Sequence, residues 1–150
     1  DPGVSVHNRT NVRGLTPGTI HGPVDLGVGH LSFISLEPVL DALLGVTRED
    51  GDLALMVKPQ FEVGKDRVGK GGVVRDPTLR AEAVAAVAAG AARRGWGARG
   101  VAVSPLPGPS GNVEFFLWLR HGPAAVDADE IEATVRGAGE PSTTGERVEP

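Results

Sequence analysis

The sequence contains no cysteine, and this absence sets the first limit on its chemistry. A chain without thiols forms no disulfide bonds and offers no cysteine ligands to a metal ion. The chain also has no run of about 18 apolar residues, so no transmembrane helix is predicted. No stretch at its start has the pattern of a secretory signal peptide. We therefore expect a cytoplasmic protein without a membrane partner.

Positive charge is also scarce. The 150 residues include 15 Lys and Arg against 19 Asp and Glu, which gives a net charge of −4. Stand-alone nucleic-acid-binding domains are usually basic. If this chain acts on RNA, much of the affinity for phosphate must therefore come from elsewhere. The sequence begins at Asp1 and not at methionine, so we expect an upstream part to be missing.

The residues that are present favour one loop-rich α/β domain with an open sheet. Apolar residues make up 40% of the chain, enough for a core, and the 22 glycines and 12 prolines indicate many turns. The nearly unbroken apolar run Leu53–Val57 predicts a strand buried on both faces. Further strands are predicted at Val4–Val6, Val24–Gly29, Trp96–Val103 and Val113–Arg120.

Helix signals are clearest in the alanine-rich segment Pro77–Arg94. Asp76 suits the N-cap, proline suits the first helical position, and Gly95 suits the end of the helix. Other segments are predicted as a helical turn at Leu15–Ile20, a helix at Glu37–Leu44 with Ser35 as its N-cap, a polar turn at Thr47–Asp52 and an amphipathic helix at Asp127–Arg136.

Lys58 directly follows the buried strand, and Pro59 then stops the hydrogen bonding of that strand. In open α/β sheets, ligands bind just outside the carboxyl ends of the strands. An amine that is partly desolvated at such a place loses its proton more easily and can act as a base. The alternative is a solvated lysine, which is the commoner case when a lysine is considered alone.

Glu114 stands next to aromatic residues at the start of the last predicted strand. A carboxylate in that setting needs a chemical or structural partner. It follows the segment Pro105–Asn112, which is long for a hairpin loop, and long loops at strand ends often carry function. Glu114 is therefore a second candidate for the site.

The segment Gly64–Gly72 predicts a mobile loop that is rich in glycine and carries Lys65, Arg67 and Lys70. These side chains can contact phosphate groups of RNA. The alternative is a solvated surface loop. The segment lacks the Gly-Lys-Ser/Thr ending of a Walker-type loop, so a nucleotide-binding loop of that kind is excluded.

Several blocks of the sequence resemble one known family. They are Arg9–Arg13, Leu31–Leu36, Val57–Lys65, Val68–Pro77 and Ser104–Leu119, and they cover about residues 1–120 in one order. In these blocks the chain is similar to the TlyA family, whose members were named haemolysin A. Members of that family are S-adenosylmethionine-dependent methyltransferases that act on ribose 2′-hydroxyls of ribosomal RNA.

The resemblance implies a Rossmann-like methyltransferase sheet of seven strands. Such a sheet is mostly parallel with an antiparallel final strand, and we expect its N-terminal part to be missing here. Residues 1–136 would be the C-terminal portion of an FtsJ-like methyltransferase domain, and residues 137–150 a disordered tail. The implied activity is 2′-O-methylation of cytidine in small- and large-subunit ribosomal RNA. S-adenosylmethionine is the implied cofactor, and ribosomal subunits are the implied partners.

The resemblance also implies a catalytic set of lysine, aspartate, lysine and glutamate. Lys58 matches the second lysine and Glu114 matches the glutamate. His30 stands where the family has its aspartate, either as a functional variant, as a loss of activity or as a one-base sequence error. The first lysine and the glycine-rich turn that holds the cofactor's amino-acid part are absent, so we expect weak cofactor binding.

Cofactor contacts are implied at four positions. Asn11 and Val12 would approach the adenine, although a polar turn residue is an equal alternative for Asn11. Leu31 and Ser32 would contact the cofactor from the next strand end. Two other functions stay open: a catalytically inactive module that binds RNA or the ribosome, and a membrane-active haemolysin. The lack of a long apolar span and of a basic amphipathic helix weighs against the haemolysin.

Overall fold

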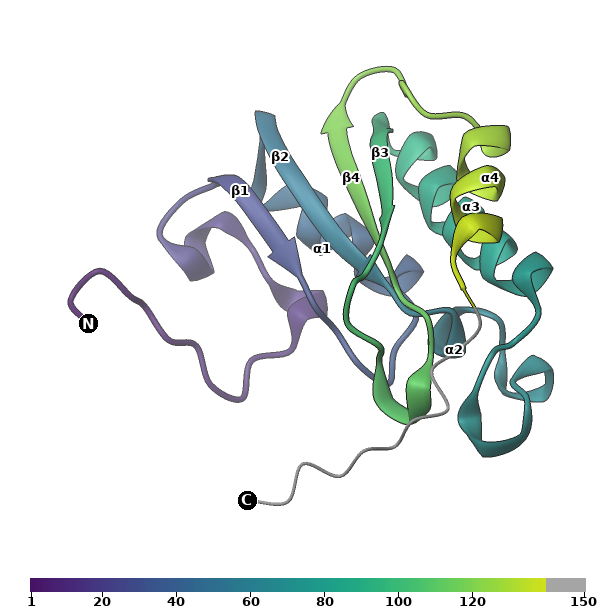
Figure 1. Ribbon diagram of the computed structural model, residues 1–150. Helices are drawn as coiled ribbons and strands as arrows, with labels where there is room; N and C mark the ends of the chain where they lie inside the picture. Colours follow the sequence, from purple (N-terminus) through teal and green to yellow (C-terminus); the bar gives the residue numbers. More distant parts are fainter. Residues whose placement is uncertain (140–150) are drawn as a thin grey trace.

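The computed structural model describes residues 1–139, which form a four-stranded mixed sheet with helices on one face (Figure 1). The strands are β1 (Val24–Gly29), β2 (Thr47–Val57), β3 (Trp96–Val103) and β4 (Phe115–His121), in the order β1-β2-β4-β3. β1 and β2 are parallel, whereas β4 runs antiparallel to β2 and to β3. The predicted antiparallel final strand is therefore confirmed, within a sheet of four described strands.

Helices lie at all the predicted places, although the helix predicted at Glu37–Leu44 is divided into the turn η3 and the shorter α1. The longer ones are α1 (Leu40–Gly45), α3 (Pro77–Arg93) and α4 (Ala128–Gly137), and the four-residue α2 (Pro59–Glu62) was not predicted. Single 3₁₀ turns lie at η1 (Val12–Gly14), η2 (Pro17–Ile20), η3 (Glu37–Val39), η4 (Lys65–Arg67), η5 (Lys70–Gly72) and η6 (Pro109–Gly111).

Local hydrogen bonds explain where the helices begin. The side chain of Asp76 accepts a hydrogen bond of 2.8 Å from the backbone N–H of Thr78, as expected for the N-cap of α3. Gly95 follows the end of α3 with φ of +81°, a conformation that favours glycine. The N-cap predicted at Ser35 was wrong: Leu36 is the N-cap of η3 and Val39 that of α1, while Ser35 Oγ accepts only a long bond of 3.4 Å from the N–H of Glu37.

The core lies between the sheet and the helices α1 and α3. Leu53, Leu55 and Val57 of β2 point into it and are at most 1% exposed. The intervening Ala54 and Met56 face the other way and are only partly buried. The prediction that this strand is buried on both faces was therefore wrong. Among residues 1–139 this second face is largely open, since Val28 is 71% exposed and Trp118 is 44% exposed, and the β3–β4 loop covers only one end of it.

Two further predictions, a turn at Thr47–Asp52 and a strand at Val4–Val6, were wrong. Thr47–Asp52 is not a turn, because it extends β2 and pairs with β1 through Thr47 and Asp52. Its polar residues are tolerated there because that end of the strand is largely exposed to solvent. Val4–Val6 is exposed and forms no strand, because a strand needs a neighbour to satisfy its hydrogen bonds and no described strand lies beside it.

The last predictions concern the end of the chain and the membrane. The helix expected at Asp127–Arg136 is α4, and a capping box between Asp127 and Glu130 begins it. The disordered tail was expected at residues 137–150, of which 140–150 lie outside the described residues. No helix within residues 1–139 has both the length and the apolar character that a membrane span requires.

Candidate active site

The register of the sheet brings Lys58 and Glu114 to neighbouring positions. Val57 of β2 pairs with Phe115 of β4 in the antiparallel ladder. The residue after Val57 is Lys58 and the residue before Phe115 is Glu114, so these two residues lie opposite each other. Alternation along each strand then places both side chains on the face opposite the core. Two residues that are 56 positions apart in sequence thus belong to one site.

A cleft of about 490 Å³ opens at this end of the sheet. One wall comes from the strand ends and the other from the loop between β3 and β4. It is mainly apolar, with a few polar groups, which is typical of small-molecule and substrate sites. The lining residues are His30, Ser32, Met56, Lys58, Ser104, Pro105, Leu106, Pro107, Gly108, Pro109, Glu114 and Phe116.

Lys58 is the buried cation of this cleft. Its side chain is 3% exposed, and its Nζ donates a hydrogen bond of 2.9 Å to Ser32 Oγ. Buried lysines are uncommon unless they are paired or functional. The structure therefore disfavours the alternative that Lys58 is a solvated lysine. The hydrogen bond also links Lys58 to Ser32, which is a predicted cofactor-binding residue.

Glu114 is equally buried, at 3% exposure. Its Oε1 accepts a hydrogen bond of 2.9 Å from the side-chain amide of Gln60. Within residues 1–139 it forms no ion pair with Lys58 below the 4.0 Å limit, although both line the same cleft. The partner expected for the carboxylate of Glu114 is thus a carboxamide in this structure.

His30 follows β1 and also lines the cleft. Unlike Lys58 and Glu114, it is exposed. The three residues matched to the family's catalytic set therefore meet in one cleft. Two of them are buried in its wall, and His30 lies on the solvent side.

Of the four predicted cofactor-binding residues, only Ser32 lines this cleft within the described part of the chain. Val12 and Leu31 are half-buried and pack against the core. Asn11 is exposed, and its Oδ1 accepts a hydrogen bond of 3.0 Å from the N–H of Arg13. Asn11 thus makes the local hydrogen bond of a polar turn residue at η1, and its contact with the cofactor stays a prediction.

The basic loop Gly64–Gly72 begins six residues after Lys58, which lines the cleft. Lys65, Arg67 and Lys70 are all exposed, and Arg67 forms an ion pair with Glu82 of α3. The loop is joined to the cleft by Asn112, which is 2% exposed. Its Nδ2 donates 2.8 Å and 3.2 Å hydrogen bonds to the carbonyls of Gly72 and Pro109, so the loop is fixed to one wall of the cleft.

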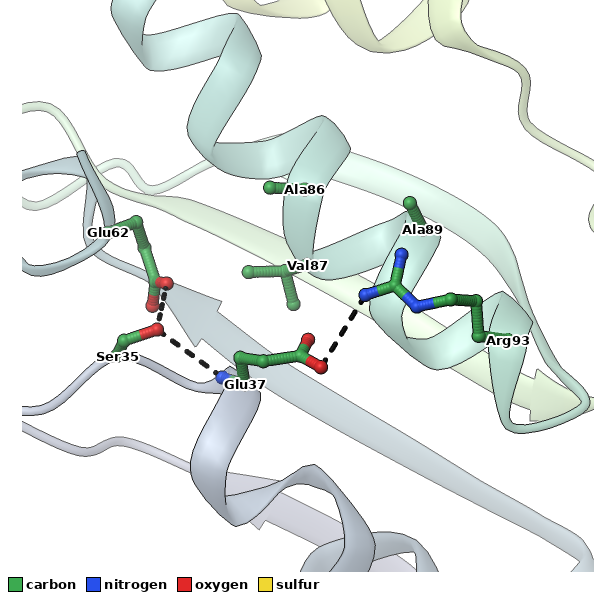
Figure 2. A pocket seen from close by; sticks show the side chains of 7 residues that line it. All are labelled: Ser35, Glu37, Glu62, Ala86, Val87, Ala89 and Arg93. Carbon is green, nitrogen blue, oxygen red and sulfur yellow. Dashed lines mark hydrogen bonds and ion pairs between the residues drawn. The ribbon is translucent and has the colours of Figure 1, made fainter.

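A second, polar groove of about 350 Å³ lies between η3, α2 and α3. Figure 2 shows Glu62 and Ser35 on one side of it and Arg93 on the other. Glu62 accepts hydrogen bonds from Ser35 Oγ at 2.7 Å and from the N–H of Leu36 at 2.9 Å. Burial raises the pKa of Glu62 above its ordinary value, and these two bonds oppose that shift only in part.

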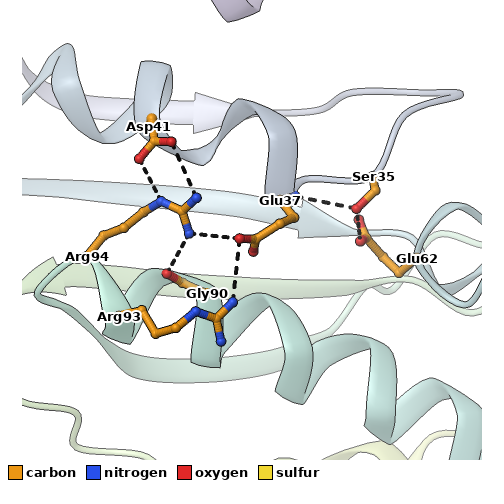
Figure 3. A network of polar contacts seen from close by, with 7 residues as sticks. All are labelled: Ser35, Glu37, Asp41, Glu62, Gly90, Arg93 and Arg94. Carbon is orange, nitrogen blue, oxygen red and sulfur yellow. Dashed lines mark hydrogen bonds and ion pairs between the residues drawn. The ribbon is translucent and has the colours of Figure 1, made fainter.

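The same groove continues into a network of ion pairs between α1 and the end of α3 (Figure 3). Arg94 bonds to Asp41 at 2.7 Å and to Glu37 at 3.0 Å, and Arg93 reaches Glu37 at 3.5 Å. These carboxylates raise the pKa of Arg94 further above its ordinary value. The network connects the η3–α1 segment to α3 and is structural in character.

Sequence reasoning missed the roles of Gln60, Glu62 and Asn112. Each is a polar residue whose partners lie more than 20 positions away or on another loop. The only signal in the sequence is their occurrence in the blocks that resemble the TlyA family. A polar residue beside proline or glycine otherwise looks like an ordinary turn residue.

Comparisons with known proteins show the family to which the chain belongs. The model of the FtsJ-like methyltransferase family matches residues 1–121. The chain is 63% identical over 120 residues to the 16S/23S rRNA (cytidine-2'-O)-methyltransferase TlyA of Mycobacterium tuberculosis. That match covers 80% of this chain and 45% of the relative, so the chain spans less than half the length of that protein. The resemblance to the TlyA family is thereby confirmed.

Two solved structures, each described as a "putative hemolysin", have the same fold. The one from Lactococcus lactis has a TM-score of 0.82 at 31% identity and covers 91% of this chain and 66% of that chain. The one from Streptococcus thermophilus has a TM-score of 0.80 at 30% identity and covers 85% and 47%. Because the family model matches most of the chain and the fold agrees with these structures, the chain belongs to the FtsJ-like methyltransferase family.

Proposed function

We propose that this protein transfers a methyl group from S-adenosylmethionine to the 2′-hydroxyl of cytidine in ribosomal RNA of both subunits. The observation that carries the proposal is the pair Lys58 and Glu114, both buried in one cleft at the carboxyl end of β2. The 63% identity to an enzyme of that name supports the choice of substrate. The proposal concerns the complete protein that the gene encodes.

The residues present fit S-adenosylmethionine at two of its parts. Val12 of η1 and Leu31, which follows β1, are half-buried apolar side chains that pack against the core and would contact the adenine. Ser32 would lie near the methyl group, because it already contacts Lys58 in the cleft. The amino-acid part of the cofactor needs the glycine-rich turn that follows the family's first strand, and residues 1–139 do not contain that turn. When bound, this cofactor supplies an electrophilic methyl group on a sulfonium.

The side chains of the cleft would perform the remaining tasks. A ribose hydroxyl is a poor acid, so it must be held in line with the methyl group and lose its proton as it attacks. Lys58 would orient the hydroxyl and stabilise negative charge that develops on its oxygen. Glu114 would act as a positioning residue, because its contact with Gln60 fixes it beside the end of β2.

His30 would affect where the proton of the ribose hydroxyl goes. A neutral imidazole accepts a proton, whereas an imidazolium does not and would repel the ammonium of Lys58. An aspartate at residue 30 would instead attract that ammonium at neutral pH. The activity of the natural chain is therefore expected to be lower than that of His30→Asp.

The test uses the complete protein, ribosomal RNA and S-adenosylmethionine with a labelled methyl group. Lys58→Ala is expected to lower methyl incorporation by about 10²-fold or more. Arg136→Ala removes a positive charge from the exposed side of α4 and should leave methyl incorporation unchanged. If Lys58→Ala retains the full rate, the catalytic assignment is wrong.

The same assay decides the second candidate function, an inactive module that binds RNA. The observation in its favour is His30 at the position where the family has an aspartate. RNA binding without methyl incorporation, and recovery of turnover in His30→Asp, would establish that alternative. Methyl incorporation by the natural sequence would exclude it.

A further inference from the structure

The loop Leu31–Leu36 connects the proposed catalytic cleft to the polar groove. It follows β1 and leads into η3, and its residues form no helix or strand. Ser32 lines the cleft, whereas Ser35 lines the groove (Figure 2). Between them Phe33 is 90% exposed and has a φ of +62°, which is uncommon for a bulky residue. Such a conformation persists only when neighbouring contacts hold it.

Two polar side chains of one short segment, Lys58 and Glu62, hold this loop by hydrogen bonds, and the ring of Phe61 between them lies 5.2 Å from that of Phe33. Lys58 Nζ donates to Ser32 Oγ at 2.9 Å. Four residues later, the carboxylate of Glu62 accepts from Ser35 Oγ at 2.7 Å and from the N–H of Leu36 at 2.9 Å. The helix α2 separates the two contact points by a single turn, so their spacing along the loop is fixed.

The segment that carries both contacts is itself rigid. Pro59 is the first residue of α2 and is buried. The N–H of Phe61 donates to the carbonyl of Lys58 at 2.9 Å, and the N–H of Val63 donates to the carbonyl of Pro59 at 3.1 Å. A displacement of the loop at Ser35 would therefore change its contact at Ser32.

We propose that Glu62 is a positioning residue for the methyl transfer, because it holds the loop Leu31–Leu36 so that Ser32 and His30 stay beside Lys58. The effect of Glu62 on the rate of methyl transfer rests on the proposed function. Its effect on the position of the loop Leu31–Leu36 does not. Glu62 touches the loop at two atoms and lines the polar groove and not the cleft. It acts on the reaction only through Lys58 and its neighbours.

The electrostatics of the groove agree with a specific role. Burial and the nearby carboxylate of Glu37 both disfavour the charged form of Glu62. Across the groove, Arg93 is paired with Glu37. Although burial disfavours its charge, Glu62 accepts hydrogen bonds from the loop Leu31–Leu36 with both of its carboxylate oxygens. Charge-assisted bonds of this kind are about twice as strong as neutral ones and fix orientation.

The first experiment measures the exposure of the Lys58 amine and needs no enzyme activity. In the complete protein, amines are acetylated with limiting reagent, and the labelling of Lys58 is compared by mass spectrometry with that of exposed Lys65. Glu62→Ala is expected to raise the relative labelling of Lys58 about tenfold, since Ser32 no longer stays beside it. Glu62→Gln keeps one acceptor oxygen and should give an intermediate value.

The second experiment measures methyl transfer with the same variants. Glu62→Ala is expected to lower kcat about tenfold, while KM for RNA stays unchanged, because the RNA-binding loop is not altered. Glu132→Gln is the matched control, since Glu132 is an exposed glutamate of α4 that pairs with Arg136. This control should change neither Lys58 labelling nor kcat.

Ser35→Ala covers the case in which Glu62→Ala does not fold. It removes one hydroxyl, keeps the carboxylate, and should shift both readouts in the same direction by a smaller factor. Unchanged Lys58 labelling in a folded Glu62→Ala or Ser35→Ala variant would overturn the inference. If the natural protein transfers no methyl group, the proposed function fails, while the labelling experiment still decides whether Glu62 positions Lys58 and Ser32.

Discussion

Gly108 lies directly against the carboxylate of Glu114. A Cβ built on Gly108 would stand 2.2 Å from Glu114 Oε1 and 2.4 Å from its Cδ, far inside contact distance. The backbone of the β3–β4 loop therefore closes over a carboxylate that Gln60 holds from the other side. The absence of a side chain at residue 108 is thus part of the geometry of the site.

Gly108→Ala should displace the carboxylate of Glu114 and break its contact with Gln60. Because the clash is with the end of a side chain and not with backbone, the fold should survive with little loss of stability. We expect methyl incorporation to fall about tenfold or more. Gly45→Ala is the control, since nothing lies within 4 Å of a Cβ there. Equal kcat in the two variants would contradict the prediction.

Asn112→Ala should destabilise the protein. Asn112 Oδ1 accepts a hydrogen bond of 3.0 Å from the buried N–H of Val74, and alanine offers no acceptor. Leaving such a donor unpaired costs about 1–3 kcal/mol in the free energy of unfolding. Urea denaturation measures this difference. Asn8→Ala, at an exposed position, should stay within about 0.5 kcal/mol of the natural chain, and a similar value for Asn112→Ala would show that Val74 finds another partner.

RNA binding should respond differently to two cations of the basic loop. Lys70 is exposed and has no ion pair among the described residues, whereas Arg67 is already paired with Glu82. Lys70→Ala should therefore reduce the slope of log K against log salt by about 0.7, the value for one phosphate contact with a single strand. Arg67→Ala should reduce it less. Titrations at several salt concentrations measure both slopes, and an unaltered slope in Lys70→Ala would remove that residue from the RNA interface.

Asp41 should make part of the stability depend on pH. Its hydrogen bond with Arg94 lowers its pKa below the ordinary value of 3.8. A lowered pKa means that the folded state binds fewer protons than the unfolded state, so the stabilisation is present above pH 3.8 and is lost as the pH falls through the lowered value. The effect is small because Asp41 is exposed.

Melting temperatures of the natural chain and of Asp41→Asn, measured between neutral and strongly acidic pH, test this relationship. The natural chain should melt higher at neutral pH, and the two curves should converge in acid. Asp66→Asn serves as a control at an exposed aspartate without an ion pair among residues 1–139. A difference that stays constant with pH would mean that the ion pair with Arg94 contributes nothing.

The parts of the fold that sequence predicted are those with local causes. The N-cap at Asp76, the glycine after α3 and the strand end at Lys58 each depend on a few neighbouring residues. The extension of β2 through Thr47 was missed because it depends on pairing with β1, which overrides the turn preference of a polar segment. The uncovered face of the sheet was also missed, because an apolar run alone does not tell how many faces are buried.

The site shows the same division. Lys58 and Glu114 were found from their positions and from a family resemblance, and the structure places them in one cleft. The hydrogen bond between Lys58 and Ser32, and the contacts of Glu62, were not found, because they join side chains 26 or 27 positions apart. The spacing of residues in the sequence does not encode which polar groups meet across a loop.

The position of β4 between β2 and β3 has a consequence for synthesis of the protein on the ribosome. Among the described strands, β3 is hydrogen-bonded to β4 alone, yet it is translated first. A nascent chain that ends before Phe115 therefore holds β3 without a partner and leaves one edge of β2 open to pairing with other chains. Glu114 emerges with the same late segment. The pairing of the four described strands and the candidate cleft are thus completed by one event, and a chain stalled just before it holds only the β1–β2 pair.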